Sequence, residues 1–191
     1  MRCTHSKGAP RRSEESLFLG ACMDRENWHI RLYDGVYSRP GLVKGLRIFD
    51  KVAVALVALS FAYALFVLLF VGELISALRL VLLAAIPFVA VSLMRSLIDL
   101  ERPYEVFDTP YLREMSVKRK KGHSFPSRHV FSAFLIGTLW LMYSPYTGTV
   151  VLLLGAFLAL ERVLLGIHFI KDVIAGAMVG LISGFIGVLI W

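Results

Sequence analysis

Long uncharged stretches alternate with charged segments along this chain, and each stretch has the length of a membrane-spanning helix. The first runs from Val52 to Gly72. At a rise of about 1.5 Å per residue, a helix of that length crosses a hydrocarbon core of roughly 30 Å. The second stretch begins after Arg79 and reaches Leu97, and Arg95 is its only charged residue. The pattern predicts two spanning helices in this half of the chain.

Two further uncharged stretches follow in the second half. Val130–Leu160 is too long for a single span, and the turn residues of Ser144–Gly148 in its middle predict a helical hairpin. The last stretch, Val173–Trp191, ends in a tryptophan, a residue favoured at membrane interfaces. The predicted fold class is therefore all-α, a polytopic membrane helical bundle with about five spanning helices and additional N-terminal interfacial helices.

The first 51 residues have a different pattern. Residues 23–51 mix Trp, Tyr, Leu and Ile with Arg and Lys, which is typical of amphipathic helices that lie on a membrane surface. Residues 1–22 are predicted to form a disordered tail. The apolar cluster LFLGACM is too short for the apolar region of a signal peptide, so no cleaved signal is expected. Residues 52–191 then form the membrane-embedded domain.

Composition agrees with a membrane protein and excludes an ordinary soluble domain. The chain is 57% hydrophobic and only 18% charged, with a net charge of +7. Because the basic residues lie beside the apolar stretches, we do not expect nucleic-acid binding. The two cysteines, Cys3 and Cys22, show no spacing that indicates a metal site or a disulfide.

The charges also predict a topology. With five spans, the N-terminal segment, residues 99–126 and residues 162–172 share one face of the membrane. Arg79 is then the only Lys or Arg predicted for the other face. The positive-inside rule predicts that the basic face is cytoplasmic.

Two arginines on that basic face lie near the end of the second span. Arg95 and Arg102 are seven residues apart, so on a helix they project from one side before Pro103 ends it. A lone intramembrane arginine is also commonly an anchor that extends its charge to the interface.

The stretch SFPSRH provides a second feature of the same face. Ser124, Pro126 and Ser127 are signals for the start of the third span. Free backbone N–H groups and the positive end of the helix dipole then favour an anion beside the first turn, where His129 lies.

The third feature is the junction between the fourth and fifth spans. Arg162 lies at the end of one helix, and His168 and Asp172 are spaced i, i+4 as the next begins. Such a carboxylate can fix the imidazole tautomer, although the same pair can also simply stabilise a helix start. Arginines, a helix N-terminus and two histidines together suit phosphoryl transfer, in which cations neutralise phosphoryl oxygens while one imidazole attacks and another protonates the leaving oxygen.

These residues form three blocks with fixed internal spacing: Arg95-x6-Arg102-Pro103, Pro126-Ser127-Arg128-His129 and Arg162-x5-His168-x3-Asp172. The pattern resembles the signature of the type-2 phosphatidic acid phosphatase family, membrane lipid phosphatases related to the vanadium haloperoxidases. The resemblance spans residues 95–172, and the surrounding helices fit that family's helical bundle.

The resemblance implies a role for each residue. His168 would be the nucleophile that becomes a phosphohistidine, Asp172 its orienting partner, and His129 the acid for the leaving group. The groups implied to bind the phosphoryl are Arg95, Arg102, Ser127, Arg128 and Arg162. The implied scheme requires no metal and no other cofactor.

Three positions depart from the family pattern. Arg95 replaces the usual Lys, which keeps the charge but changes its geometry. Arg128 replaces the usual Gly, and an extra cation beside the phosphate favours a diphosphate or an anionic headgroup. Glu161 replaces the usual Ser, and the sequence leaves its role open.

The expected function is hydrolysis of a lipid phosphate or diphosphate monoester by an integral protein of a prokaryotic plasma membrane, with its catalytic face cytoplasmic. Its expected partners are the bilayer and a membrane lipid phosphate. Two alternatives stay open: a phosphatase of a soluble phosphate monoester such as a sugar phosphate, and a non-catalytic anion- or lipid-binding scaffold. A transporter is disfavoured because no internal repeat is evident. Neither the lipid nor the oligomeric state follows from the sequence.

Overall fold

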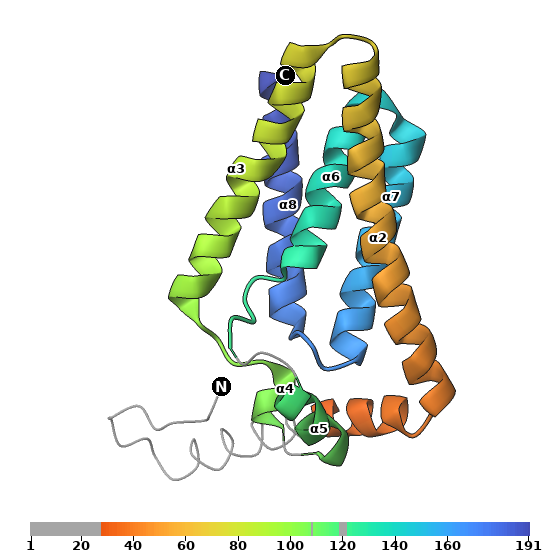
Figure 1. The fold of residues 1–191 in the computed structure, drawn as a ribbon. Helices are drawn as coiled ribbons and strands as arrows, with labels where there is room; N and C mark the ends of the chain where they lie inside the picture. The colour runs from red at the N-terminus through yellow and green to blue at the C-terminus, as the bar shows by residue number, and fades with distance from the viewer. Residues whose placement is uncertain (1–27, 108, 119–121) are drawn as a thin grey trace.

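The computed structural model describes residues 28–107, 109–118 and 122–191, and these are all-helical apart from turns and loops. The predicted disordered tail, residues 1–22, lies outside the described residues. Five long helices form a bundle (Figure 1): α2 (Pro40–Phe70), α3 (Leu74–Ile98), α6 (Arg128–Tyr143), α7 (Pro145–Leu164) and α8 (Ile170–Ile190). Two short helices, α4 (Pro103–Val106) and α5 (Pro110–Lys118), lie at its base with a helix over residues 28–37.

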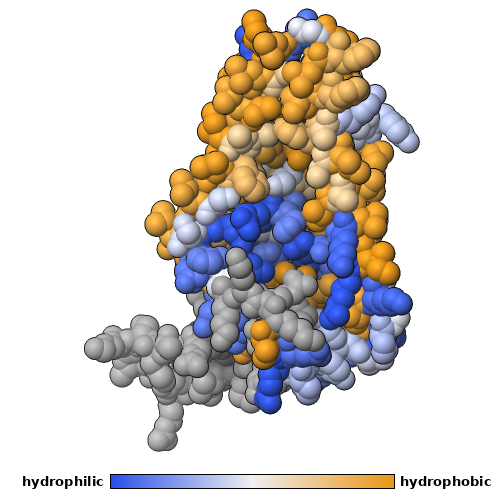
Figure 2. All heavy atoms as spheres, in the orientation of Figure 1, coloured by the Kyte–Doolittle hydropathy of each residue, from blue (hydrophilic) through white to orange (hydrophobic). Residues whose placement is uncertain are grey.

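The prediction of a polytopic all-α membrane bundle is confirmed. Within the described residues, α2, α3, α7 and α8 are long and apolar enough to cross a membrane. The face of the bundle seen in Figure 2 is hydrophobic over most of its height. The third predicted span, α6, has 16 residues and a length of roughly 24 Å. It contacts the other four long helices and so forms the centre of the bundle.

The long helices run alternately up and down (Figure 1). The segment between α3 and α6, the junction between α7 and α8, and the start of α2 therefore lie at one end of the bundle. This is the shared face that the sequence predicts. Which end of the bundle faces the cytoplasm stays a prediction.

The helix that contains the first span begins earlier than the boundary at residue 52 predicted from the sequence. Because Pro40 occupies the first turn of α2, residues 40–51 continue directly into the first span. Residues 28–37 form a separate helix across the base, where Tyr33 packs in a buried cluster with Phe107 and Leu112. The described part of the segment predicted to be interfacial, residues 28–51, thus consists of one basal helix and the first turns of α2.

A row of glycines on α8 brings α6 unusually close. A Cβ atom added at Gly176 would lie 2.6 Å from the carbonyl oxygen of Ser127, and one added at Gly180 would lie 2.5 Å from that of Phe131. Gly184 continues the row, and all three glycines are buried. Small residues spaced by four let membrane helices approach at backbone distance. The row therefore sets the position of α6 against α8.

We expect Gly180→Ala to destabilise the bundle, because its methyl group would displace the α6 backbone. The cost of overpacking is about 1–3 kcal/mol, visible as a lower Tm for thermal unfolding in detergent. Gly45→Ala is the matched control, since no atom lies within 4 Å of its added Cβ. Alanine also has the higher helix propensity, so that control should keep or raise the Tm. Equal Tm values for the two variants would contradict the close packing.

Candidate active site

Helix α3 ends between Arg95 and Arg102, which corrects one expectation from the sequence. Asp99 ends α3 in a left-handed conformation with φ of 30°, and its carboxylate accepts a hydrogen bond of 3.0 Å from the His123 amide. Arg102 is extended, and its amide donates to the Glu105 carboxylate at 2.8 Å. The prediction that Arg95 and Arg102 lie two turns apart on one helix is wrong, because the helix ends between them.

Both arginines nevertheless meet at the loop that precedes α6. Arg95, which is buried, donates to the carbonyl oxygens of His123 and Pro126. Arg102 donates from Nε to Gly122 at 3.0 Å and from Nη2 to His123 at 3.4 Å. The backbone carbonyl oxygens of residues 122–126 thus face two guanidinium groups, and these hydrogen bonds fix the conformation of the loop.

The start of α6 follows the sequence signals. Ser127 is the N-cap residue, and α6 begins at Arg128. The Ser127 side chain makes no capping bond, and its buried Oγ has no hydrogen-bond partner among the described residues. Arg128 and His129 occupy the first turn, and both are exposed. The first turn of α6 therefore offers a cation, an imidazole and a buried hydroxyl.

His168 and Asp172 form the expected pair, and a third residue joins them. Nδ1 of His168 lies 3.6 Å from Oδ2 of Asp172, and both side chains are almost fully buried. The buried Ser124 hydroxyl donates to Oδ2 of Asp172 and lies 3.4 Å from Nδ1 of His168. Oδ2 also accepts a 3.0 Å bond from the Phe169 amide, so Asp172 stabilises the start of α8 as well. The helix-stabilising interpretation of this pair therefore holds, and the orienting role of Asp172 stays a prediction.

Burial sets the charge of His168. Burial and, to a smaller extent, the cations of Arg102 and Arg162 lower the pKa of His168, while the contact with Asp172 raises it; together they bring it to about 4. The imidazole is therefore neutral at pH 7, as a nucleophile must be. Because Nδ1 faces Asp172, Nε2 is the nitrogen available to the cavity that His168 lines.

Arg162 is held from a distant part of the chain. Its Nη2 forms an ion pair with Asp50 of α2, and its side chain is 6% exposed. Nε of Arg162 has no hydrogen-bond partner among the described residues. The neighbouring Glu161 is buried too, and its role stays open.

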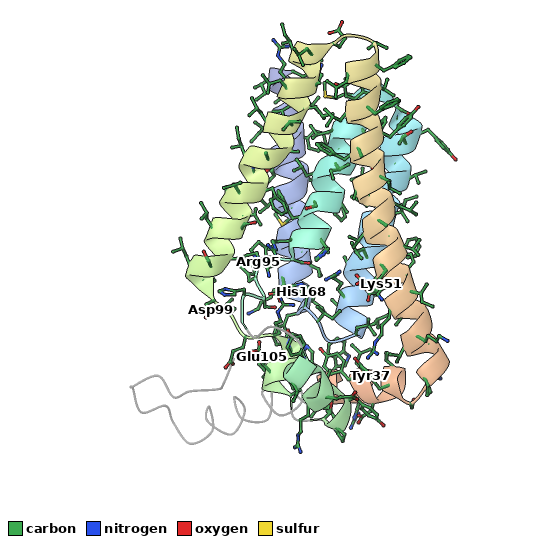
Figure 3. The ribbon with its side chains drawn as sticks, in the orientation of Figure 1. Tyr37, Lys51, Arg95, Asp99, Glu105 and His168 are labelled. Atoms are coloured by element: carbon green, nitrogen blue, oxygen red, sulfur yellow. The ribbon has the colours of Figure 1, made fainter. Side chains whose placement is uncertain are left out.

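These groups surround a cavity of about 210 Å³. Its lining residues are Arg95, Arg102, Tyr104, Arg128, His129, Arg162 and His168. Of the eight site residues predicted from the sequence, only Ser127 and Asp172 are not among them, and these two lie directly behind Arg128 and His168. Figure 2 shows a hydrophilic hollow below the hydrophobic surface, and Figure 3 shows Arg95 and His168 close to the first turn of α6.

Residues 76–191 match the PAP2 superfamily. This chain belongs to that family of membrane phosphatases. The match contains all three sequence blocks and every residue that lines the cavity. The resemblance noted from the sequence is thus confirmed at the level of the family.

Individual PAP2 relatives agree with this assignment. The bacitracin transport permease protein BcrC of Bacillus licheniformis is 31% identical over 106 residues, covering 54% of this chain and 52% of the relative. The chain therefore spans about half the length of that curated relative.

Two crystal structures share the fold. Aquifex aeolicus LpxE superposes with a TM-score of 0.61 at 23% identity, covering 84% of this chain and 94% of that one. The first transmembrane PAP2 type phosphatidylglycerolphosphate phosphatase from Bacillus subtilis superposes with a TM-score of 0.64 at 18% identity, covering 89% and 86%.

Sequence reasoning missed three contributors to the site. From the sequence, Ser124 is recognisable only as a signal for the start of a helix. Its contact with Asp172 could not be predicted, because the two residues are 48 positions apart. Asp50 lies 112 positions from Arg162, and no local pattern connects them. Tyr104 directly follows the Arg102-Pro103 block. Of the three, it was therefore the easiest to predict from the sequence as a residue near the cavity.

We expect Ser124→Ala to lower the kcat of phosphatase turnover about tenfold or more, with KM little changed. The lost hydrogen bond joins the Asp172 carboxylate, which lies next to His168, and not the substrate. Steady-state kinetics on purified protein measure the effect, and Ser124→Thr should restore most of it because a hydroxyl remains. Ser96→Ala, an exposed serine of α3, is the matched control. A change confined to KM would contradict a positioning role.

Proposed function

We propose that this PAP2 protein hydrolyses the phosphate or diphosphate monoester of a membrane lipid through a phosphohistidine intermediate. One observation carries the proposal. His168, neutral and backed by Asp172 and Ser124, opens onto a cavity lined by four arginines. A nucleophile facing a cluster of fixed cations suits a reaction in which negative charge spreads over phosphoryl oxygens.

In the first step, the lone pair of Nε2 of His168 attacks phosphorus and the bond to the leaving oxygen breaks. The electron pair of that bond goes to the leaving oxygen, and His129 on the opposite helix start supplies its proton. The arginines and the amides at the start of α6 neutralise the phosphoryl oxygens. Asp172 stabilises the charge that develops on the imidazole.

In the second step, water attacks the phosphohistidine. His129, now unprotonated, accepts a proton from the water, so the same residue serves as acid and then as base. The bond between Nε2 and phosphorus breaks, its electron pair returns to His168, and inorganic phosphate leaves. The cycle ends with both histidines in their starting states.

The location of the cavity supports a lipid substrate. The hydrophilic hollow lies at one end of the bundle directly below the hydrophobic surface (Figure 2). A lipid phosphate at the bilayer interface reaches such a site while its chains stay in the hydrocarbon core. The Bacillus subtilis structure, named as a phosphatidylglycerolphosphate phosphatase, shares this fold and is consistent with a lipid phosphate as the substrate class.

We expect His168→Ala to lower lipid phosphatase turnover at least on the order of a thousandfold, because it removes the covalent route. Phosphate release by purified protein is measured with EDTA on phosphatidic acid, phosphatidylglycerol phosphate, diacylglycerol pyrophosphate, a polyprenyl diphosphate and glucose 6-phosphate. The thermal unfolding curve of the variant shows whether it is folded.

Each other outcome of that assay has a distinct meaning. Turnover of glucose 6-phosphate alone would identify a soluble-substrate phosphatase. Wild-type protein inactive on every compound would favour a binding scaffold. A strict need for Mg²⁺ would contradict the assignment of charge neutralisation to the arginines. Full activity of a folded His168→Ala variant would exclude His168 as the nucleophile.

We further propose that the catalytic face is cytoplasmic, because the basic residues gather there. In a variant without Cys3 and Cys22, Val117→Cys and Tyr146→Cys are matched probes, since these side chains are 83% and 81% exposed at opposite ends of the bundle. A membrane-impermeant thiol reagent applied to intact cells should label position 146 and leave position 117 unmodified. The reverse pattern would place the cavity outside the cell.

A further inference from the structure

The four arginines of the cavity differ in what holds them. Arg95 and Arg102 donate to backbone carbonyl oxygens of the loop over residues 122–126. Arg162 is paired with Asp50. In contrast, Arg128 forms no hydrogen bond or ion pair within the described part of the chain, and its side chain is exposed on the cavity wall. Arg128 is therefore a cation of the site that is not committed to a protein partner.

The position of Arg128 places it on the leaving-group side of the proposed reaction. Arg128 directly precedes His129 in the first turn of α6, and both line the cavity. In the proposed mechanism, His129 protonates the leaving oxygen while His168 attacks from the other helix junction. A cation beside His129 therefore lies near the leaving group.

A second cation near the leaving group has most to stabilise when that group carries a full negative charge of its own. Asp172, behind His168, already has Ser124 and the Phe169 amide as hydrogen-bond donors, and Asp50 is paired with Arg162. No carboxylate among the residues that line the cavity balances Arg128. A neutral lipid alcohol would leave this guanidinium without a counter-charge, whereas a phosphate leaving group would provide one.

We propose that Arg128 binds the lipid-proximal phosphate of a diphosphate substrate, so that the group released from His168 is a lipid monophosphate. This inference rests on the proposed function and names its substrate class. Nε2 of His168 bonds to the terminal phosphorus, and the bond from that phosphorus to the bridging oxygen breaks. The electron pair stays on the bridging oxygen, which becomes a phosphate oxygen of the lipid monophosphate beside Arg128. Water then releases the terminal group as inorganic phosphate.

The extra cation also suits an anionic headgroup, the other possibility that the sequence leaves open. In phosphatidylglycerol phosphate, the second phosphate is separated from the reacting one by a glycerol. In a diphosphate, a single oxygen joins the two phosphates. Arg128 and His129 are consecutive residues and both line the cavity, so a charge joined directly to the leaving oxygen, as in a diphosphate, suits Arg128 better than a more distant one.

The test compares substrates that differ by one phosphate on the same lipid: diacylglycerol pyrophosphate with phosphatidic acid, and farnesyl diphosphate with farnesyl phosphate. We expect Arg128→Ala to lower kcat/KM for each diphosphate by about tenfold to a hundredfold more than for its monophosphate, as for a lost charged hydrogen bond. Arg128→Lys should recover part of the preference, because it keeps the charge without the fork. Arg31→Ala, an exposed arginine of the basal helix, is the matched control and should leave the ratio unchanged.

The outcomes separate the inference from the function on which it rests. Equal losses on both members of each pair would overturn the role of Arg128 while phosphatase activity itself remains established. A selective loss on phosphatidylglycerol phosphate would overturn it in favour of headgroup recognition. If wild-type protein releases phosphate from none of these lipids, the proposed function and the inference both fail.

Discussion

The close approach of α6 to α8 is the constraint on which the rest of the site depends. Glycines at 176 and 180 leave room for the backbone of α6 where any side chain would collide. At the end of this contact, the Ser127 amide donates to the Asp172 carbonyl at 2.9 Å. Two helix starts are thereby joined, one carrying His129 and the other following His168. Without that contact, His129 and His168 would have no defined separation.

The site concentrates positive charge in a setting where charge is costly. Four arginines line one small cavity at the edge of the hydrophobic surface, and buried cations require compensation. The protein provides it largely through backbone carbonyl oxygens, which Arg95 and Arg102 use to shape the loop before α6. Carbonyl dipoles satisfy donors without cancelling the charge. The cavity therefore keeps a net attraction for an anion while Arg95 and Arg102 are held in place.

Local patterns explain why much of the architecture is predictable. Span positions follow from the thickness of the bilayer, and α6 begins where Ser127 and Pro126 signal a start. The pairing of His168 with Asp172 also follows from spacing, since residues i and i+4 are neighbours at a helix start. The expectation for Arg102 failed for a local reason as well, because Asp99 adopts a left-handed conformation that no spacing rule anticipates.

The sequence by itself determined that this protein is a membrane-embedded helical bundle and which charged residues form its three blocks, because hydrophobic length and helical spacing act over short stretches of chain. Only the tertiary structure decided how those blocks are supported. Ser124 contacts Asp172 across 48 residues, and Asp50 pairs with Arg162 across 112. Such contacts depend on how helices pack in three dimensions, and only the structure shows that Arg128, unlike the other arginines of the cavity, has no hydrogen bond or ion pair with the described residues.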